Sequence, residues 1–144
     1  MTTALIDDQL LGAVLRGRRP RVLASKEIYT TGCWYVRLCQ AALGAHERTG
    51  VLSGPFAALP EPLRQRALAA VLELPDEVGM LSLRELGPTI AELRSRHQLN
   101  ILSIEALAAA SRLNAHVHLS ASSPKLEQAL RSANLEVKVH PPPR

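Results

Sequence analysis

The 144-residue chain is poor in aromatic residues, which make up 3% of it, and it contains only two cysteines. Proteins that grip single-stranded nucleic acid usually stack the bases on aromatic rings inside a basic groove. One Trp, two Tyr and one Phe supply few such rings, so any contact with nucleic acid has to depend on charge. Cys33 and Cys39 are spaced as neither a zinc site nor a redox pair, and we expect both to be reduced thiols.

The sequence also lacks an apolar run near the roughly 18 residues that a membrane-spanning helix needs. Its first residues carry no basic segment of the kind that opens a secretory signal. Seventeen Lys and Arg against thirteen Asp and Glu give a formal net charge of +4, which permits acidic partners without identifying one. We therefore expect a soluble, cytoplasmic protein with no membrane partner.

Hydrophobic residues make up 47% of the chain and occur in short blocks whose spacing predicts strands alternating with helices. The clearest region is 98–130, where a helix capped by Ser103 precedes a strand, and a second helix begins at Ser123-Pro124. The expected strands cover 3–6, 78–81, 116–119 and 135–139, and the expected helices cover 8–16, 28–43, 63–74, 83–96, 103–113 and the segment after Pro124. This order predicts an α/β fold with a small, mostly parallel sheet flanked by helices.

The length and the continuous alternation of elements predict a single domain over residues 1–140. Several Gly and Pro residues between 44 and 60 interrupt the periodic pattern, so we expect a long loop there. Three consecutive prolines cannot extend a strand's hydrogen-bond ladder. Residues 141–144 are therefore expected to form a Pro-rich C-terminal tail.

Asp7 is the first candidate for a functional residue. It follows the apolar strand expected over 3–6 and comes directly before a helix. The carboxyl ends of strands are where wound α/β proteins keep their sites. Asp is also among the residues that most often cap a helix, and on the sequence alone this structural interpretation is favoured.

A short basic cluster follows the first helix. Such a cluster is either a solvated loop or a contact for the phosphates of a nucleic acid. Its members, which we treat as candidate nucleic-acid-binding residues, are Arg16, Arg18, Arg19 and Arg21.

Four stretches and their order resemble the PIN domain, a compact three-layer α/β/α fold that in most members is a magnesium- or manganese-dependent ribonuclease. The stretches are ALIDDQLLGAVL, VGMLSL, SIEALAAASRLNA and VHLSAS. The resemblance implies that Asp7 is the first acid of a metal site and that Glu105, or Ser103 in another register, takes the place of the acid opening an Ala-rich helix. It covers nearly the whole chain, and stand-alone members of this length are often toxins of the VapC type.

The chain departs from the family pattern at the other acidic positions. An acid usually found in the second helical region would fall near 34–36, where no Asp or Glu stands, while Glu27 is several residues early and Glu47 late. Ser120 and Ser122 occupy the Thr-x-Asp turn. Asp7 and Glu105 are thus relic candidates for metal ligands, and two carboxylates hold Mg²⁺ poorly because this ion sheds its water reluctantly.

We therefore expect a PIN-like protein with a degenerate metal site that acts by binding RNA or a protein partner. The resemblance to the PIN domain implies a homodimer. The likeness to toxins of the VapC type implies an antitoxin-like protein partner. The alternative is an active ribonuclease of the VapC type that uses Mg²⁺ or Mn²⁺, with Asp7, Asp8 and Glu105 supplemented by Glu27 or a His. Lesser alternatives are a helix-turn-helix DNA-binding regulator over 83–113 and a zinc site built from His116, His118 and His140.

Overall fold

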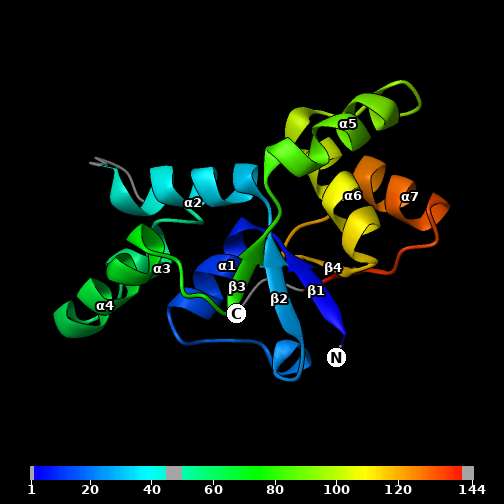
Figure 1. The fold of residues 1–144 in the computed structure, drawn as a ribbon. Helices are drawn as coiled ribbons and strands as arrows, with labels where there is room; N and C mark the ends of the chain where they lie inside the picture. Colours follow the sequence, from blue (N-terminus) through cyan, green and yellow to red (C-terminus); the bar gives the residue numbers. More distant parts are fainter. Residues whose placement is uncertain (1, 45–49, 141–144) are drawn as a thin grey trace.

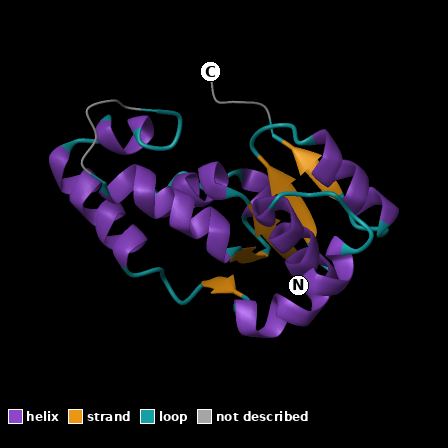
Figure 2. Ribbon diagram, turned by 90° about the horizontal axis from the view of Figure 1, so that it is seen from above, coloured by secondary structure: helices purple, strands orange, loops and turns teal. Residues whose placement is uncertain are grey.

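The computed structural model describes residues 2–44 and 50–140, and it shows a parallel sheet between two groups of helices (Figures 1 and 2). Neighbouring strands are all parallel, in the order β3-β2-β1-β4-β5. The α/β class and the three-layer arrangement predicted from the sequence are confirmed. The strands are β1 (Thr3–Ile6), β2 (Glu27–Thr30), β3 (Val78–Met80), β4 (His116–Leu119) and β5 (Val137–Val139).

Helices cover both faces of this sheet. In Figure 1 the helices from the first half of the chain lie on one side and those from the second half on the other. They are α1 (Asp8–Leu15), α2 (Gly32–Leu43), α3 (Gly54–Ala57), α4 (Glu61–Leu72), α5 (Leu83–Arg94), α6 (Ile101–Leu113) and α7 (Pro124–Ser132), together with a short 3-10 helix η1 (Arg21–Leu23). None of the helices in the described ranges has the length and apolar character needed to cross a membrane.

The sheet separates two hydrophobic cores because successive side chains of a strand point to opposite faces. In β1, Ala4 and Ile6 pack into the core shared with α1 and α4, whereas Leu5 packs into the core shared with α6 and α7. All three are fully buried. Strands of parallel sheets that are covered on both faces are apolar throughout, which explains why the sequence predicted β1 with its correct bounds.

The segment 28–43 differs from its predicted helical structure. Residues 27–30 form the strand β2, whose burial alternates between exposed and buried positions, and the helix begins only at Gly32. Thr31 ends the extended segment and caps α2, since its hydroxyl accepts a hydrogen bond from the amide of Trp34. Tyr29, Thr30 and Thr31, which fall within the expected helix, are therefore the end of a strand and a helix cap.

The Ala-rich helix α6 starts two residues earlier than expected. Asn100, not Ser103, is its cap, and the Asn100 side chain accepts a hydrogen bond from the Ser103 amide at 2.8 Å. Asn114 ends the helix in the left-handed conformation that Asn adopts more readily than most residues. Residues 103–110 are all buried, so α6 has no exposed face there to enter a DNA groove. This burial argues against the helix-turn-helix alternative.

Candidate functional site

The strand order places a reversal between β1 and β4. From β1 the chain proceeds to β2 and β3 on one side of the sheet, and then crosses back to β4 and β5 on the other. In open parallel sheets, ligands bind outside the carboxyl ends of the strands at such a reversal. Asp7 directly follows β1 and Ser120 directly follows β4, so the fold brings these two residues to the position where a site is expected.

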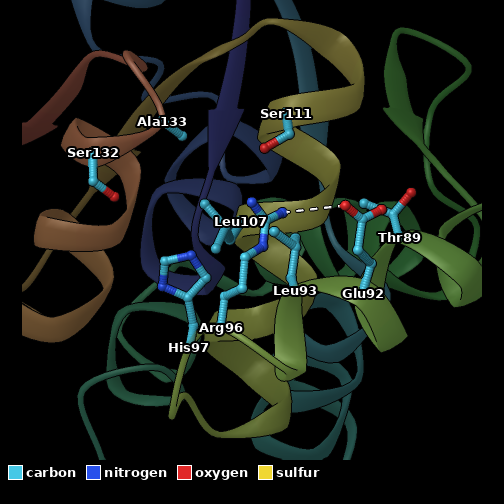
Figure 3. A pocket seen from close by; sticks show the side chains of 9 residues that line it. All are labelled: Thr89, Glu92, Leu93, Arg96, His97, Leu107, Ser111, Ser132 and Ala133. Carbon is cyan, nitrogen blue, oxygen red and sulfur yellow. Dashed lines mark hydrogen bonds and ion pairs between the residues drawn. The ribbon is translucent and has the colours of Figure 1, made fainter.

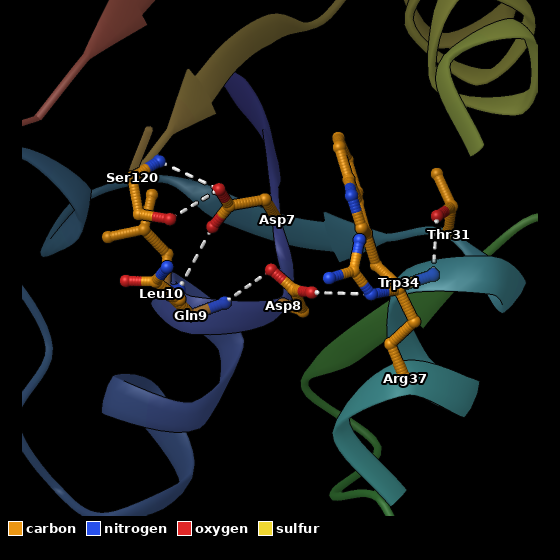
Figure 4. A network of polar contacts seen from close by, with 8 residues as sticks. All are labelled: Asp7, Asp8, Gln9, Leu10, Thr31, Trp34, Arg37 and Ser120. Atoms are coloured by element: carbon orange, nitrogen blue, oxygen red, sulfur yellow. Dashed lines mark hydrogen bonds and ion pairs between the residues drawn. The ribbon is translucent and has the colours of Figure 1, made fainter. Parts of the chain in front are cut away.

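Asp7 joins the two central strands through its carboxylate (Figure 4). Oδ1 accepts a hydrogen bond from the Leu10 amide at 3.1 Å, which makes Asp7 the cap of α1. Oδ2 accepts hydrogen bonds from the Ser120 amide at 2.7 Å and the Ser120 hydroxyl at 2.6 Å. Three protein donors therefore satisfy a carboxylate that is only 6% exposed.

Asp8 turns toward a different partner, Arg37 of α2 (Figure 4). Its Oδ2 lies 3.4 Å from the Arg37 Nε, and its Oδ1 accepts a hydrogen bond from the Gln9 amide at 2.9 Å. Burial raises the pKa of the Asp8 carboxyl and the neighbouring Asp7 charge raises it further, while Arg37 acts in the opposite direction. The Arg37 guanidinium thus provides the positive charge beside this acid.

Glu105 is fully buried and reaches from α6 to the N-terminus of α2. Its Oε2 accepts a hydrogen bond from the Gly32 amide at 3.1 Å, and its Oε1 accepts one from the Cys33 amide at 2.9 Å. The first amides of a helix have no partner within the helix and carry partial positive charge. Glu105 therefore meets the positive end of a helix dipole, which belongs to α2 and not to its own helix α6.

The thiol beside Glu105 is kept protonated. Burial, and then the hydrogen bond and charge of Glu105, raise the pKa of Cys33 to about 11. Cys33 and Cys39 are both free cysteines, which agrees with the expectation of reduced thiols. A thiol with so high a pKa is a poor nucleophile at neutral pH.

Other side chains occupy the positions where the family would place its remaining acids. Trp34 is 4% exposed and packs in the core at the start of α2. In the turn after β4, the Ser122 hydroxyl donates to Glu127 Oε2 at 2.9 Å, and the Ser123 amide donates to the same oxygen at 2.8 Å. These two bonds lower the pKa of Glu127. Sequence reasoning missed Glu127, which is a fourth carboxylate bound by internal donors.

Glu27, considered as a substitute acid, does not restore the site. Glu27 opens β2 and is paired in register with Thr3, the first residue of β1. Because the strands are parallel, Glu27 lies at the amino edge of the sheet, opposite Asp7. Glu47 lies outside the described residues. Within the ranges that the structure describes, no group of three or more His, Cys, Asp or Glu residues could hold a metal ion.

The arginine cluster lies away from Asp7. Helix α1 begins at Asp8 and has eight residues, so it carries the chain about 12 Å from the carboxyl edge of the sheet before the cluster starts. The Arg16 Nε donates to the Gly12 carbonyl at 3.1 Å, and its guanidinium lies 5.6 Å from the centre of the Phe56 ring. The three remaining arginines are exposed; they are Arg18, Arg19 and Arg21. The cluster therefore offers a surface separate from the acids.

Two histidines form a contact that the sequence did not reveal. His118 of β4 and His140 after β5 lie with Nδ1 and Nε2 2.9 Å apart. His118 is 4% exposed, and among the described side chains its Nε2 is the buried polar atom without a hydrogen-bond partner. His116 instead faces Glu136, with 3.6 Å between Nδ1 and Oε2. The three histidines expected in the zinc alternative thus have different partners.

A separate hollow of about 490 Å³ lies among α5, α6 and α7 (Figure 3). Its charged members, Arg96 and Glu92, are paired with each other at 3.4 Å. Both are exposed, and the candidate acids Asp7 and Glu105 do not line it. The hollow therefore adds no reactive group to the site at the sheet edge.

No protein-family model, curated protein or solved structure matches this chain. Interpretation of the site therefore depends on its own geometry.

Proposed function

We propose that this chain is a PIN-like domain whose metal-dependent nuclease chemistry is lost or weak, and that it acts by binding RNA or a protein. The observation that carries the proposal is the state of the candidate carboxylates. Asp7 accepts three hydrogen bonds, Asp8 pairs with Arg37, and Glu105 accepts two backbone amides. The residues at this sheet edge do not fit a Mg²⁺ or Mn²⁺ site.

The cost of freeing these oxygens supports the proposal. Mg²⁺ needs a nearly octahedral shell of oxygens and gives up its water reluctantly. Each buried donor deprived of its acceptor would cost about 1–3 kcal/mol. A metal ion at Asp7 and Glu105 would therefore have to displace several favourable contacts with few ligands in return.

The alternative, an active ribonuclease of the VapC type, predicts RNA cleavage that depends on a divalent metal and on Asp7. Our proposal predicts the opposite result. The purified chain, incubated with single-stranded RNA and an excess of Mg²⁺ or Mn²⁺, is expected to cleave no faster than the Asp7→Asn variant. Calorimetric titration with Mn²⁺ is expected to show no site that depends on Asp7. Metal-dependent cleavage that disappears in Asp7→Asn would establish the active enzyme and reject our proposal.

Binding of RNA is assigned to the exposed arginines after α1. Each phosphate contact with a single strand contributes about −0.7 to the slope of log K against log salt concentration. Replacement of Arg18, Arg19 and Arg21 by Ala is therefore expected to reduce the magnitude of this slope by up to about 2, measured by fluorescence anisotropy with labelled RNA.

The matched control removes the same charge elsewhere. Arg66, Arg84 and Arg94 are exposed on α4 and α5, and their triple Ala variant should keep the wild-type slope. An equal reduction of the salt-dependence slope in both triple variants would show that net charge alone attracts RNA. The arginine cluster would then not be a binding site.

Protein binding is the second candidate, and an exposed apolar stripe on α2 favours it. Val36 and Leu43 are 52% and 38% exposed, and their spacing of seven places them on one face of the helix. This face could serve a homodimer or an antitoxin-like partner, the two partners that the PIN likeness implies. Sedimentation of the wild type and of the Val36→Gln variant tests whether this face forms a homodimer. If the wild type is a dimer and the variant is a dimer as well, this face of α2 is not the dimer interface.

A further inference from the structure

A small cavity lies over β4 and β5 on the α1 side of the sheet. His118 is paired in register with Ile6, whose side chain packs in the α1 core, so both point to this side. The cavity has a volume of about 170 Å³. Its lining residues come from the α1–β2 connection and from the two strands; they are Val22, Lys26, His116, Val117, His118, Glu136, Val137 and Lys138.

The charges around the cavity favour an anion. Lys26 and Lys138 both line it, and the single acidic member, Glu136, has a side chain that is 79% exposed and faces His116. The positive charges of Lys26 and Lys138 are near enough to His118 to lower its pKa, after the larger effects of burial and of His140. Two lysines beside a neutral imidazole would repel a metal cation and attract an oxyanion.

His118 adds a polar atom that lacks a partner. Its Nδ1 is engaged with His140, and its Nε2 is buried without a hydrogen bond. Buried polar groups are usually satisfied, and an exception calls for an explanation such as an ion. In the tautomer in which His140 donates to Nδ1, the His118 Nε2 carries a proton, and this N–H is a donor suited to a phosphate oxygen.

The volume restricts the ligand to a small group. Sites for drug-sized molecules have about 300–1,000 Å³, so a cavity of about 170 Å³ does not enclose a nucleoside. It does have room for one tetrahedral oxyanion. The connection that supplies Val22 and Lys26 also carries exposed Arg18 and Arg19, which would attract the same class of ligand from solution.

We propose that this cavity binds a phosphate group through Lys26, Lys138 and His118. The group is either free inorganic phosphate or the terminal phosphate of an RNA whose remaining nucleotides stay outside. The proposal does not depend on the loss of nuclease activity or on RNA binding by the arginine cluster, because it concerns different residues.

The test uses the full chain and two probes. Inorganic phosphate is titrated calorimetrically at constant ionic strength, and RNA of one sequence is compared with and without a 5′-phosphate. We expect saturable binding of phosphate, and its affinity should fall by at least about tenfold when Lys26 and Lys138 are both replaced by Met. Each replacement removes one charge-assisted hydrogen bond to the phosphate. Methionine keeps the apolar stem, and both lysines lie at positions that are not buried, so the fold should tolerate the change.

Lys125→Met is the matched control, because Lys125 is exposed on α7 and does not line the cavity. It should bind both probes as the wild type does, and phosphate should shift the His118 ring resonances in both proteins. Binding of 5′-phosphorylated RNA without binding of inorganic phosphate would identify RNA as the source of the group. The proposal would be overturned if neither probe bound, or if replacement of Lys26 and Lys138 left the affinity unchanged. Binding of Zn²⁺ through His116 and His118 would also overturn it.

Discussion

Replacement of Glu105 by Ala is expected to reduce the free energy of unfolding by about 3–5 kcal/mol. The side chain is fully buried, and its carboxylate accepts the amides of Gly32 and Cys33. Without it, two donors at the start of α2 lose their acceptors and a cavity opens between α2 and α6. Since domains are stable by only about 5–15 kcal/mol, urea unfolding should show the loss clearly.

Two further variants make this prediction specific. Glu105→Gln keeps one oxygen acceptor and should lose less stability than Glu105→Ala. Glu92 is exposed and pairs with Arg96, which lies just beyond the end of α5, so Glu92→Ala should change stability by less than about 1 kcal/mol. If Glu105 instead belonged to a working metal site, removal of its charge would relieve repulsion, and a more stable Glu105→Ala protein would refute the structural role described above.

Stability is expected to fall as the pH is lowered from about 6.5 toward 4 because of His118. Burial, and then the charges of His140, Lys26, His116 and Lys138, lower the pKa of His118 to about 4 from its ordinary 6.5. Between these values the unfolded chain binds the proton and the folded chain does not, so protons favour unfolding. Well above pH 6.5 this effect costs no stability, and at pH 4 the loss of stability would amount to about 3 kcal/mol.

The comparison with His118→Asn isolates this contribution. Asn can keep the hydrogen bond to His140 but does not titrate. Between pH 6.5 and 4.5, the free energy of unfolding of the variant should therefore fall less steeply than that of the wild type, by about 1 kcal/mol per pH unit. Burial and the charge of Lys138 also lower the pKa of His140, while the charge of Asp7 acts in the opposite direction. His140 is present in both proteins, so its contribution cancels in the comparison. His97→Asn, outside this cluster, is the control. An unchanged pH dependence in His118→Asn would contradict the assignment.

The sequence predicted much of the fold because local signals and burial agree there. β1 and β4 are apolar or alternating segments with clear ends, and Asn114 and Pro124 mark helix boundaries by their backbone preferences. The strand β2 has the same length as β1 and is also followed by a helix after one residue, but it begins with the exposed Glu27 and lacks the apolar run that marked β1, so it was missed. In a short segment, helical and strand periodicities cannot be distinguished.

The candidate site was predictable only in part. The position of Asp7 at the end of an apolar strand located the sheet edge, but its bond to Ser120 joins positions 113 apart. Glu105 reaches amides 72 and 73 positions away. Pairing of Asp8 with Arg37 depends on how α1 packs against α2. Spacing along the chain carries no information about such partners, so the donors that occupy the carboxylates emerged only from the structure.

The central position of β1 has a consequence for biosynthesis. This first strand pairs with β2 on one side and with β4 on the other, so one of its edges stays bare on the ribosome until residues 116–119 have emerged. A bare apolar edge recruits strands from other chains, and partly folded chains of this size aggregate by that route. We therefore expect the nascent polypeptide to be most prone to aggregation after β1 has emerged and before β4 has.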